Sequence, residues 1–240
     1  MTRRRRRRRL GRWLLLLAVV LGAVAAWQAL TWPDVAALAR TRPATTAFIE
    51  RWRAEQRAAG RPDRVAWTWV DGGAISSHLK RAVLVAEDIN FLSHRGFDTG
   101  EMREAVARAL EGAAPPRGAS TITQQLAKNL WLSPSRNPLR KVKEAALTWQ
   151  LERTLGKRRI LELYVNVVEL GPGVYGAEAA SRRYFGKAAA ELSEDDAAQL
   201  AAALPRPRSW HPGVESRAYR AYVDSIRRRM DRAAFLHGAF

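Results

Sequence analysis

The pattern of apolar and polar positions begins with one uninterrupted apolar run. Residues 13–30 (WLLLLAVVLGAVAAWQAL) hold only one polar side chain, Gln28. A helix of this length covers roughly 27 Å, about one hydrocarbon core, so a transmembrane helix is predicted over 13–32. The arginines of residues 1–12 all lie before it, which predicts a cytoplasmic tail and export of everything that follows. A cleaved signal peptide stays open as an alternative, because Ala23-Val24-Ala25 resembles a cleavage site.

The remaining apolar positions follow a helical period. Residues 33–66 are interpreted as an amphipathic connector and 67–240 as one globular domain. Only 65–70 (VAWTWV) is expected to be extended. Helices are expected over 77–87, 98–112, 137–156, 160–168, 176–185, 193–204 and 216–236, and another is expected to begin at 121. Start signals support five of them: Ser77, Asp98 with Glu101, Thr121 with Gln124, Asn137 before Pro138, and Ser193 with Asp196. The predicted fold class is mainly α.

Charge and composition narrow the function classes. The 240 residues allow one good core, and the absence of cysteine excludes disulfides and thiolate metal sites. Arg3–Arg9 and Arg12 supply eight positive charges, and taking eight from the net +18 leaves +10 for the rest. A basic chain favours nucleic acid, anionic lipid or a phosphorylated substrate. The predicted export argues against nucleic acid.

Four segments hold polar residues that packing alone does not explain. The first, 86–98, begins with Glu87 and Asp88 at a helix end, where the helix macrodipole disfavours carboxylates. The second, 118–129, offers helix-start amides and hydroxyls suited to an anion. The third, 140–144, places basic residues and Glu144 on one helix side. The fourth runs over 160–176. A solvated helix end, an ordinary capped helix, a surface ion-pair cluster and core packing remain the respective alternatives.

Together these segments resemble the peptidoglycan glycosyltransferase family, which contains the polymerase domains of bifunctional penicillin-binding proteins and the monofunctional biosynthetic transglycosylases. The resemblance rests on EDINFLSHRGFD, GASTITQQLAKNLWL, RKVKEAALTWQLE and ILELYVNVVELGPGVYGAEAASRRYFGK, in this order. The short chain with one anchor is similar to the monofunctional branch. Many relatives carry a basic residue where this chain has Asn90, so no cationic substrate contact is expected there.

The resemblance implies polymerisation of lipid II into β-1,4-linked glycan with release of undecaprenyl pyrophosphate. It implies that Glu87 is the general base and that Glu144 is the second catalytic glutamate on the donor side. Lys128, Arg140 and Lys141 are expected to bind phosphate. The other expected substrate-binding residues are Asp88, Phe91, His94, Ser120, Thr121, Gln124, Gln125, Tyr164 and Asn166.

The resemblance also implies a lysozyme-like α-helical domain outside the inner membrane, with a membrane-dipping part at 99–117. There an apolar stripe contains Met102, Ala105, Val106, Ala109 and Leu110. Expected partners are lipid II, the growing glycan, membrane lipid and other cell-wall or division proteins, without nucleic acid. Mg²⁺ or another divalent cation fits a pyrophosphate substrate, although the sequence holds no all-protein metal cage.

Two other functions remain open beside this one. A lysozyme-like glycan-cleaving enzyme would need a raised-pKa acid and no pyrophosphate site, so the cluster of Lys128, Arg140 and Lys141 argues against it. A non-catalytic membrane scaffold would tolerate loss of Glu87. An acyl-transfer function is not expected, because the S-x-x-K pattern at Ser77–Lys80 is not followed by S-D-N or K-T-G.

Overall fold

The computed structural model describes residues 3–110, 120–133, 137–236 and 238, except for the side chains at 3–11, 17, 21, 24–25, 106, 109–110 and 138. The chain divides into two compact units, Met1–Asp34 and Val35–Phe240. The first unit contains the helix α1 (Arg3–Leu30). Among the described residues, no helix combines the length and the apolar character that crossing a membrane requires. The segment predicted at 13–32 is helical up to Leu30. That this helix crosses a membrane stays a prediction.

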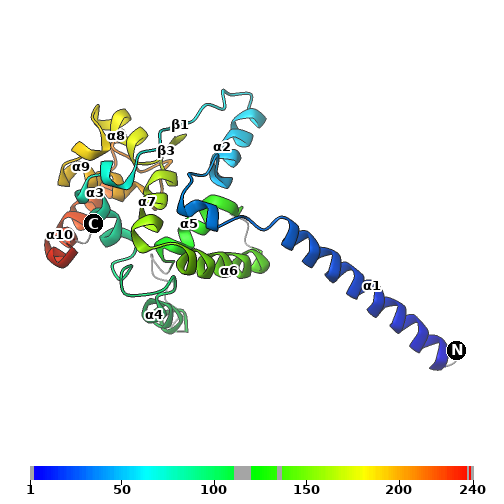
Figure 1. The fold of residues 1–240 in the computed structure, drawn as a ribbon. Coiled ribbons are helices and arrows are strands. Elements are labelled where there is room, and N and C mark those ends of the chain that lie inside the picture. Colours follow the sequence, from blue (N-terminus) through cyan, green and yellow to red (C-terminus); the bar gives the residue numbers. More distant parts are fainter. Residues whose placement is uncertain (1–2, 111–119, 134–136, 237, 239–240) are drawn as a thin grey trace. The chain divides into compact units, whose positions relative to one another are not determined.

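The second unit is mainly helical, which confirms the predicted fold class (Figure 1). Its α-helices are α2 (Ala47–Ala58), α3 (Ser77–Glu87), α4 (Thr99–Leu110), α5 (Ile122–Trp131), α6 (Pro138–Thr154), α7 (Lys157–Val167), α8 (Ala177–Phe185), α9 (Glu194–Ala203) and α10 (Arg217–Arg232). Short 3₁₀ helices cover Ala36–Ala39, Gly72–Ala74, Ala189–Glu191 and Ala234–Leu236. The strands are β1 (Ala66–Trp67), β2 (Glu169–Gly171) and β3 (Val174–Tyr175).

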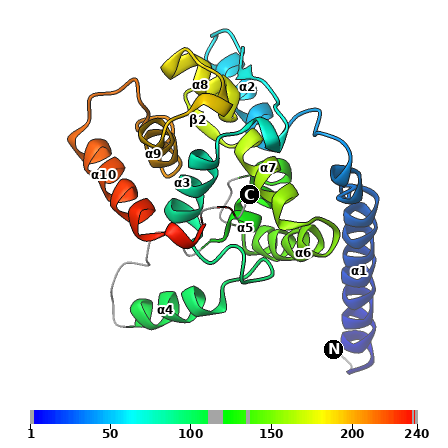
Figure 2. The same cartoon turned by 60° about the vertical axis from the view of Figure 1, so that its left-hand side comes forward.

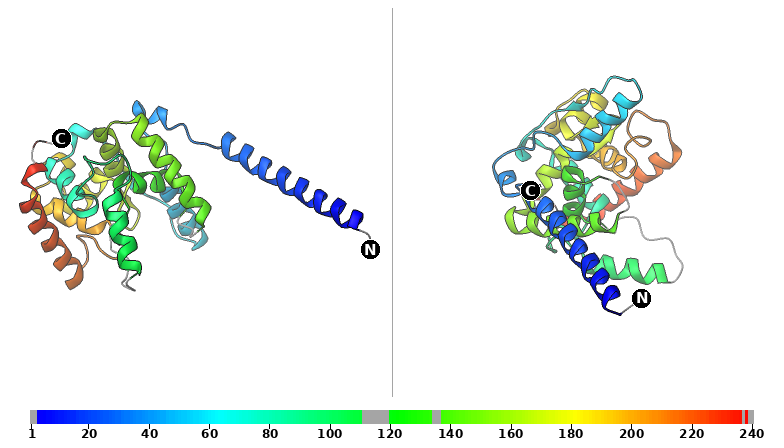
Figure 3. Two further views of the ribbon diagram at one scale, coloured as in Figure 1. Left: turned by 90° about the horizontal axis from the view of Figure 1, so that it is seen from below. Right: turned by 90° about the vertical axis from the view of Figure 1, so that its right-hand side faces the viewer.

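Two groups of helices form the core of this unit. In one group α3, α9 and α10 pack on one another, as Figures 2 and 3 show from different sides. The buried face of α9 is rich in alanine, which lets neighbouring helices approach closely, and Leu84 and Ile226 fill the space from α3 and α10. In the other group α5 packs against α2, α6 and α7. The two groups meet where Glu87 and Asp88, at the end of α3, bond to Gln125 and Ile122 of α5.

Most predicted helix starts are confirmed. Thr121 with Gln124 and Ser193 with Asp196 form reciprocal capping boxes. Asn137 caps α6 with Pro138 in its first turn. At α3 the prediction is wrong by one residue, because Ser76 and not Ser77 accepts the amide of His78. The last helix, expected over 216–236, is shorter, because α10 ends at Arg232 and a separate 3₁₀ turn follows.

A small sheet was only partly predicted. The strand expected at 65–70 is confirmed for Ala66–Trp67 alone, where β1 pairs in parallel with β3. β3 also pairs with antiparallel β2, and these two strands are too short and too buried to show alternation. Gly176, between β3 and α8, has φ 79°, and a Cβ there would lie 2.5 Å from the carbonyl oxygen of Asn166. This close approach explains why glycine is required.

Helix α4 lies apart from both helix groups in Figures 1 and 2. Its start is capped by Asp98, whose Oδ1 accepts the amides of Gly100 and Glu101 at 2.9 and 3.0 Å. Met102 is exposed and Ala105 is half-buried. The side chains of Val106, Ala109 and Leu110, and residues 111–117, lie outside the described part of the chain. The predicted lipid contact at 99–117 stays a prediction.

Candidate functional site

Glu87 is the last residue of α3, and its carboxylate is held in a largely buried position. Its Oε2 accepts a hydrogen bond from Nε2 of Gln125 on α5 at 2.7 Å. Burial raises the pKa of the Glu87 carboxyl, while the Gln125 hydrogen bond and the charges of Lys128 and Arg229 offset part of that rise. A raised pKa suits a group that must accept a proton and release it again.

Gln125 joins Glu87 to the hydroxyl group of Tyr164. Tyr164 on α7 donates to Oε1 of Gln125 at 2.9 Å, which leaves the amide nitrogen directed at Glu87. The same nitrogen donates to the carbonyl oxygen of Ser120 at 3.2 Å. Tyr164 is fully buried, and burial together with Glu87 and Asp88 raises its pKa well above the usual value. The Tyr164 hydroxyl therefore stays protonated and, as a hydrogen-bond donor, orients the Gln125 amide.

Asp88 points away from Glu87 and ties the first polar segment to α5. Its Oδ2 accepts the amide of Ile122 at 2.9 Å, and Nε2 of His94 lies 2.9 Å from its Oδ1. The Gly96 amide donates to Nδ1 of His94, so the ring proton is on Nε2 and is donated to Asp88. Both side chains are nearly inaccessible to solvent. These contacts position the loop that follows Glu87.

Thr121 and Gln124, expected to line a substrate cleft, are both buried and form the cap of α5. The Thr121 hydroxyl also donates to the carbonyl oxygen of Gly96 at 2.7 Å. Gly96 has φ 87°, and a Cβ there would lie 2.8 Å from Cγ2 of Thr148. The loop carrying His94 therefore fits closely between α5 and α6.

The basic cluster assembles around Glu144. Nη1 of Arg140 lies 2.7 Å from its Oε2, and Lys141 is paired with its Oε1, while the Glu144 side chain is only 3% exposed. Burial lowers the pKa of Lys128 on α5, and the charges of Arg140 and Lys141 lower it further, whereas Glu144 and Glu87 raise it. The structure thus brings Lys128 into electrostatic reach of both proposed catalytic glutamates.

Two of the predicted substrate contacts involve side chains that the structure places fully inside the protein. Phe91 is fully buried, with the Lys157 ammonium 4.3 Å from its ring centre and His94 at its edge. Asn166 is also fully buried, and its amide exchanges hydrogen bonds with the backbone of Val70 at 2.9 and 3.0 Å. Both side chains pack inside the protein, and the polar atoms of Asn166 are paired, so their substrate contacts stay a prediction.

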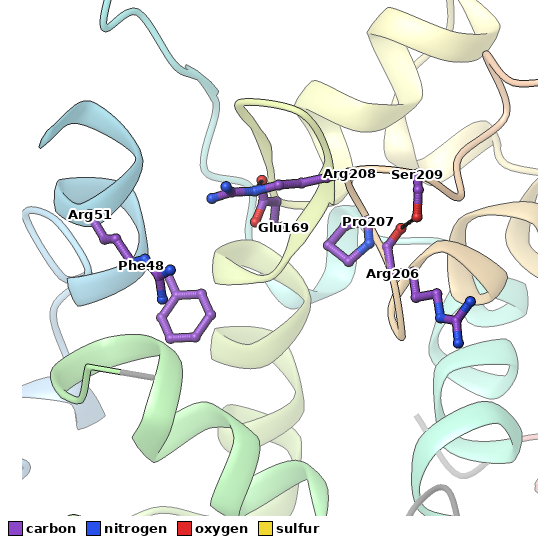
Figure 4. Close-up of a pocket in the computed structure, with 7 residues that line it drawn as sticks. All are labelled: Phe48, Arg51, Glu169, Arg206, Pro207, Arg208 and Ser209. Carbon is purple, nitrogen blue, oxygen red and sulfur yellow. Dashed lines mark hydrogen bonds and ion pairs between the residues drawn. The ribbon is translucent and has the colours of Figure 1, made fainter. Parts of the chain in front are cut away.

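A cavity of about 190 Å³ opens beside Gln125 and Lys128. Its other lining residues are Phe48, Asn129, Tyr164, Val168, Glu169, Leu204, Pro205 and Pro207. A neighbouring pocket of about 320 Å³ shares Phe48, Glu169 and Pro207 and adds Arg51, Arg206, Arg208 and Ser209. In Figure 4 the Arg208 side chain extends toward Phe48 and Arg51, whereas Arg206 points away from them. The proposed phosphate-binding lysine therefore borders a hollow that continues toward α2.

Sequence reasoning missed several of these residues. Arg229 on α10 acts on the charge of Glu87, and Phe48 lies under the ammonium of Lys128 at 5.8 Å from the ring centre. Arg208 binds Glu55 and Glu169 at 2.7 and 3.1 Å, while burial raises the pKa of Glu169. Phe48, Arg208 and Arg229 lie outside the four motifs, so no local signal marked them, whereas Glu169 belongs to the fourth motif and was not singled out.

In the described part of the chain, no three His, Asp or Glu residues are grouped closely enough to hold a metal ion. Both carboxylate oxygens of Glu144 are already paired with cations. A divalent cation at the pyrophosphate site therefore stays a prediction.

Comparison with known proteins points to one family. The sequence model described as "Transglycosylase" matches residues 54–231. A biosynthetic peptidoglycan transglycosylase of Thiobacillus denitrificans is 48% identical over 192 residues, covering 80% of this chain and 83% of the relative. One from Azoarcus sp. is 45% identical over 225 residues, covering 92% and 96%. One from Alcanivorax borkumensis is 47% identical over 201 residues, covering 84% and 78%.

Proposed function

The chain belongs to the transglycosylase family and is a glycosyltransferase of peptidoglycan synthesis, and we propose that it polymerises lipid II into linear β-1,4-linked strands. The family match spans all of the residues that carry the proposed chemistry, from Glu87 to Tyr164. The observation that carries the proposal is the buried Glu87 carboxylate beside a cluster of cations.

In the proposed reaction Glu87 is the general base. The C4 hydroxyl of one lipid-linked disaccharide attacks the anomeric carbon of the growing chain, and its proton passes to the Glu87 carboxylate. The new C4–O–C1 bond forms as the bond from C1 to the pyrophosphate oxygen breaks, with inversion at C1. Gln125 holds the carboxylate in place through the 2.7 Å hydrogen bond. The raised pKa of Glu87 makes it a stronger base than an exposed glutamate.

The leaving pyrophosphate needs neutralisation more than protonation. Lys128, Arg140 and Lys141 supply three positive charges for its oxygens. Glu144 binds Arg140 and Lys141 on the same helix, so we assign it the role of holding these cations in position before the phosphates arrive. In this proposal the chain's own cations neutralise the pyrophosphate, and a divalent cation stays a separate prediction.

The proposed location is the inner membrane. The apolar run of 13–32 and the arginines before it support a single anchor with its N-terminus in the cytoplasm and its domain outside. A lysozyme-like arrangement of the helical domain belongs to the same proposal. Lipid II, the growing glycan and membrane lipid are the proposed partners.

Purified full-length chain in detergent, incubated with lipid II, tests the proposal. We expect long glycan that muramidase converts to disaccharide units. In a parallel incubation with preformed glycan, shortening of the glycan would identify a cleaving enzyme instead. If neither lipid II nor the glycan changes, the chain is a non-catalytic scaffold. Either of these results overturns the proposed function.

A further inference from the structure

Helix α6 carries an apolar stripe on its outer side. Leu139, Val142 and Trp149 are 73%, 66% and 56% exposed, and Ala146 between them is exposed as well. Their spacing of three and four residues places all four on one face, here named the α6 stripe. Large apolar side chains gathered on one exposed face usually mark an interaction surface.

The charges of α6 are sorted between its two sides. Its acidic residues, Glu144 and Glu152, are turned inward, with side chains only 3% and 7% exposed, and each is paired with cations. Lys143 and Arg153 border the α6 stripe, and the Arg153 guanidinium lies 4.7 Å from the ring centre of Trp149. The outer side of α6 is therefore apolar and basic.

We propose that the α6 stripe docks on an anionic lipid bilayer. A helix with apolar side chains and tryptophan on one face, bordered by lysine and arginine, has the composition of an interfacial helix. Tryptophan favours the headgroup level, where anionic lipids attract the flanking cations. An interface with a second protein is less favoured, because such interfaces are depleted in lysine.

This contact deepens the proposed membrane location and names the surface that meets the lipid. It differs from the lipid contact predicted at 99–117, which lies on α4. Arg140 and Lys141 belong to the same helix, so docking of α6 brings the proposed pyrophosphate-binding cations to the headgroup level. A lipid-linked pyrophosphate would then reach them without leaving the membrane.

The absence of cysteine allows a site-specific test with the full-length chain. An environment-sensitive fluorophore is attached to V142C, and to A190C as a matched control. Ala190 is exposed and lies beside α8, which Figures 1 and 2 show well separated from α6. Both proteins are reconstituted in phosphatidylcholine vesicles with and without phosphatidylglycerol.

In the anionic vesicles we expect the label at 142 to shift to blue, to be quenched by nitroxide-bearing lipid and to resist aqueous iodide. The label at 190 should show none of these changes. An anchor acting alone would attach the chain to vesicles while leaving the label at 142 open to iodide, and that result overturns the proposal. Protection from both quenchers would mean that protein covers the stripe, which overturns it as well.

Charge reversal tests the role of lipid charge. The pair K143E and R153E should reduce the blue shift at 142 in anionic vesicles, whereas R217E with R220E, both exposed on α10, should not. An unchanged shift in the first pair would overturn the proposed attraction to anionic lipid. These readouts measure contact with lipid and not turnover, so they remain informative if Glu87 proves not to be the base.

Discussion

The Tyr164 hydroxyl donates a hydrogen bond to Oε1 of Gln125 at 2.9 Å, and this contact decides which end of the Gln125 amide faces Glu87. With its oxygen engaged, the amide can present only its nitrogen to the carboxylate. The hydrogen bond favours the charged form of Glu87, against the effect of burial. Gln125 and Tyr164 thus act together on the proposed base from two other helices.

Replacing Glu87 with Gln should abolish most polymerisation. The substitution keeps the size of the side chain and removes the proton acceptor, so the rate should fall about 10²–10⁴-fold. Affinity for a phosphoglycolipid inhibitor should remain, because the cations of α5 and α6 are intact. Steady-state polymerisation and inhibitor titration of the same sample measure both, with exposed Glu215→Gln as the control. Near-normal polymerisation would falsify the assignment of Glu87 as the base.

The same substitution should stabilise the folded protein at neutral pH. Folding raises the pKa of Glu87 above 4.5, so stability contributed by its protonated form is lost as the pH rises from 4.5 through the raised value. Glu87→Gln removes that loss. At pH 7 the variant should therefore unfold at a higher temperature than the parent chain. This difference in unfolding temperature should disappear at pH values below 4.5. A difference in unfolding temperature that does not change with pH would contradict the raised pKa of Glu87.

The pH profile of activity should depend on Gln125. Glu87 must be deprotonated to act as a base, so kcat/KM should fall on the acid side as the pH drops through its raised pKa. Gln125→Leu removes the hydrogen bond that lowers this pKa, and the acid limb should move to higher pH. Tyr164→Phe should move it in the same direction by less, because the amide loses only its orientation. An acid limb that stays in place in both variants would show that Gln125 acts in some other way.

Lys141 should serve the pyrophosphate. Lys141→Ala is expected to reduce turnover and to weaken phosphoglycolipid binding together, by about 10- to 150-fold, because a hydrogen bond to a charged group contributes about 1.5–3 kcal/mol. Exposed Arg217→Ala is the matched loss of one positive charge. Unchanged inhibitor affinity in folded Lys141→Ala protein would refute the role of this lysine.

Asn166 should matter for stability and not for substrate binding. Asn166→Ala leaves the backbone groups of Val70 and the carbonyl oxygen of Glu162 without their side-chain partner. The free energy of unfolding should fall by about 1–3 kcal/mol. Below the unfolding transition, inhibitor affinity should match that of the parent chain, and exposed Asn90→Ala should change neither quantity much. Weak inhibitor binding by folded Asn166→Ala would restore its predicted substrate contact.

The sequence by itself determined the features that depend on neighbours in the chain. The capping boxes of α5 and α9 and the Asn137-Pro138 start of α6 were predicted because a cap involves residues only three positions apart. Glu87 and Glu144 were selected by motif order, and the carboxylate of Glu144 does lie between Arg140 and Lys141 on its own helix. A one-residue error at Ser76 shows that adjacent serines compete for the same cap.

Only the tertiary structure decided which side chains of each motif meet one another. Tyr164 and Asn166 stand two residues apart in one motif and were both expected to bind substrate. Successive residues of an α-helix turn by about 100°, so these two point to nearly opposite sides of α7. One reaches Gln125 on α5 and the other the backbone of Val70. Arg229 meets the charge of Glu87 only because α10 packs on α3, a contact between distant parts of the chain that no local pattern encodes.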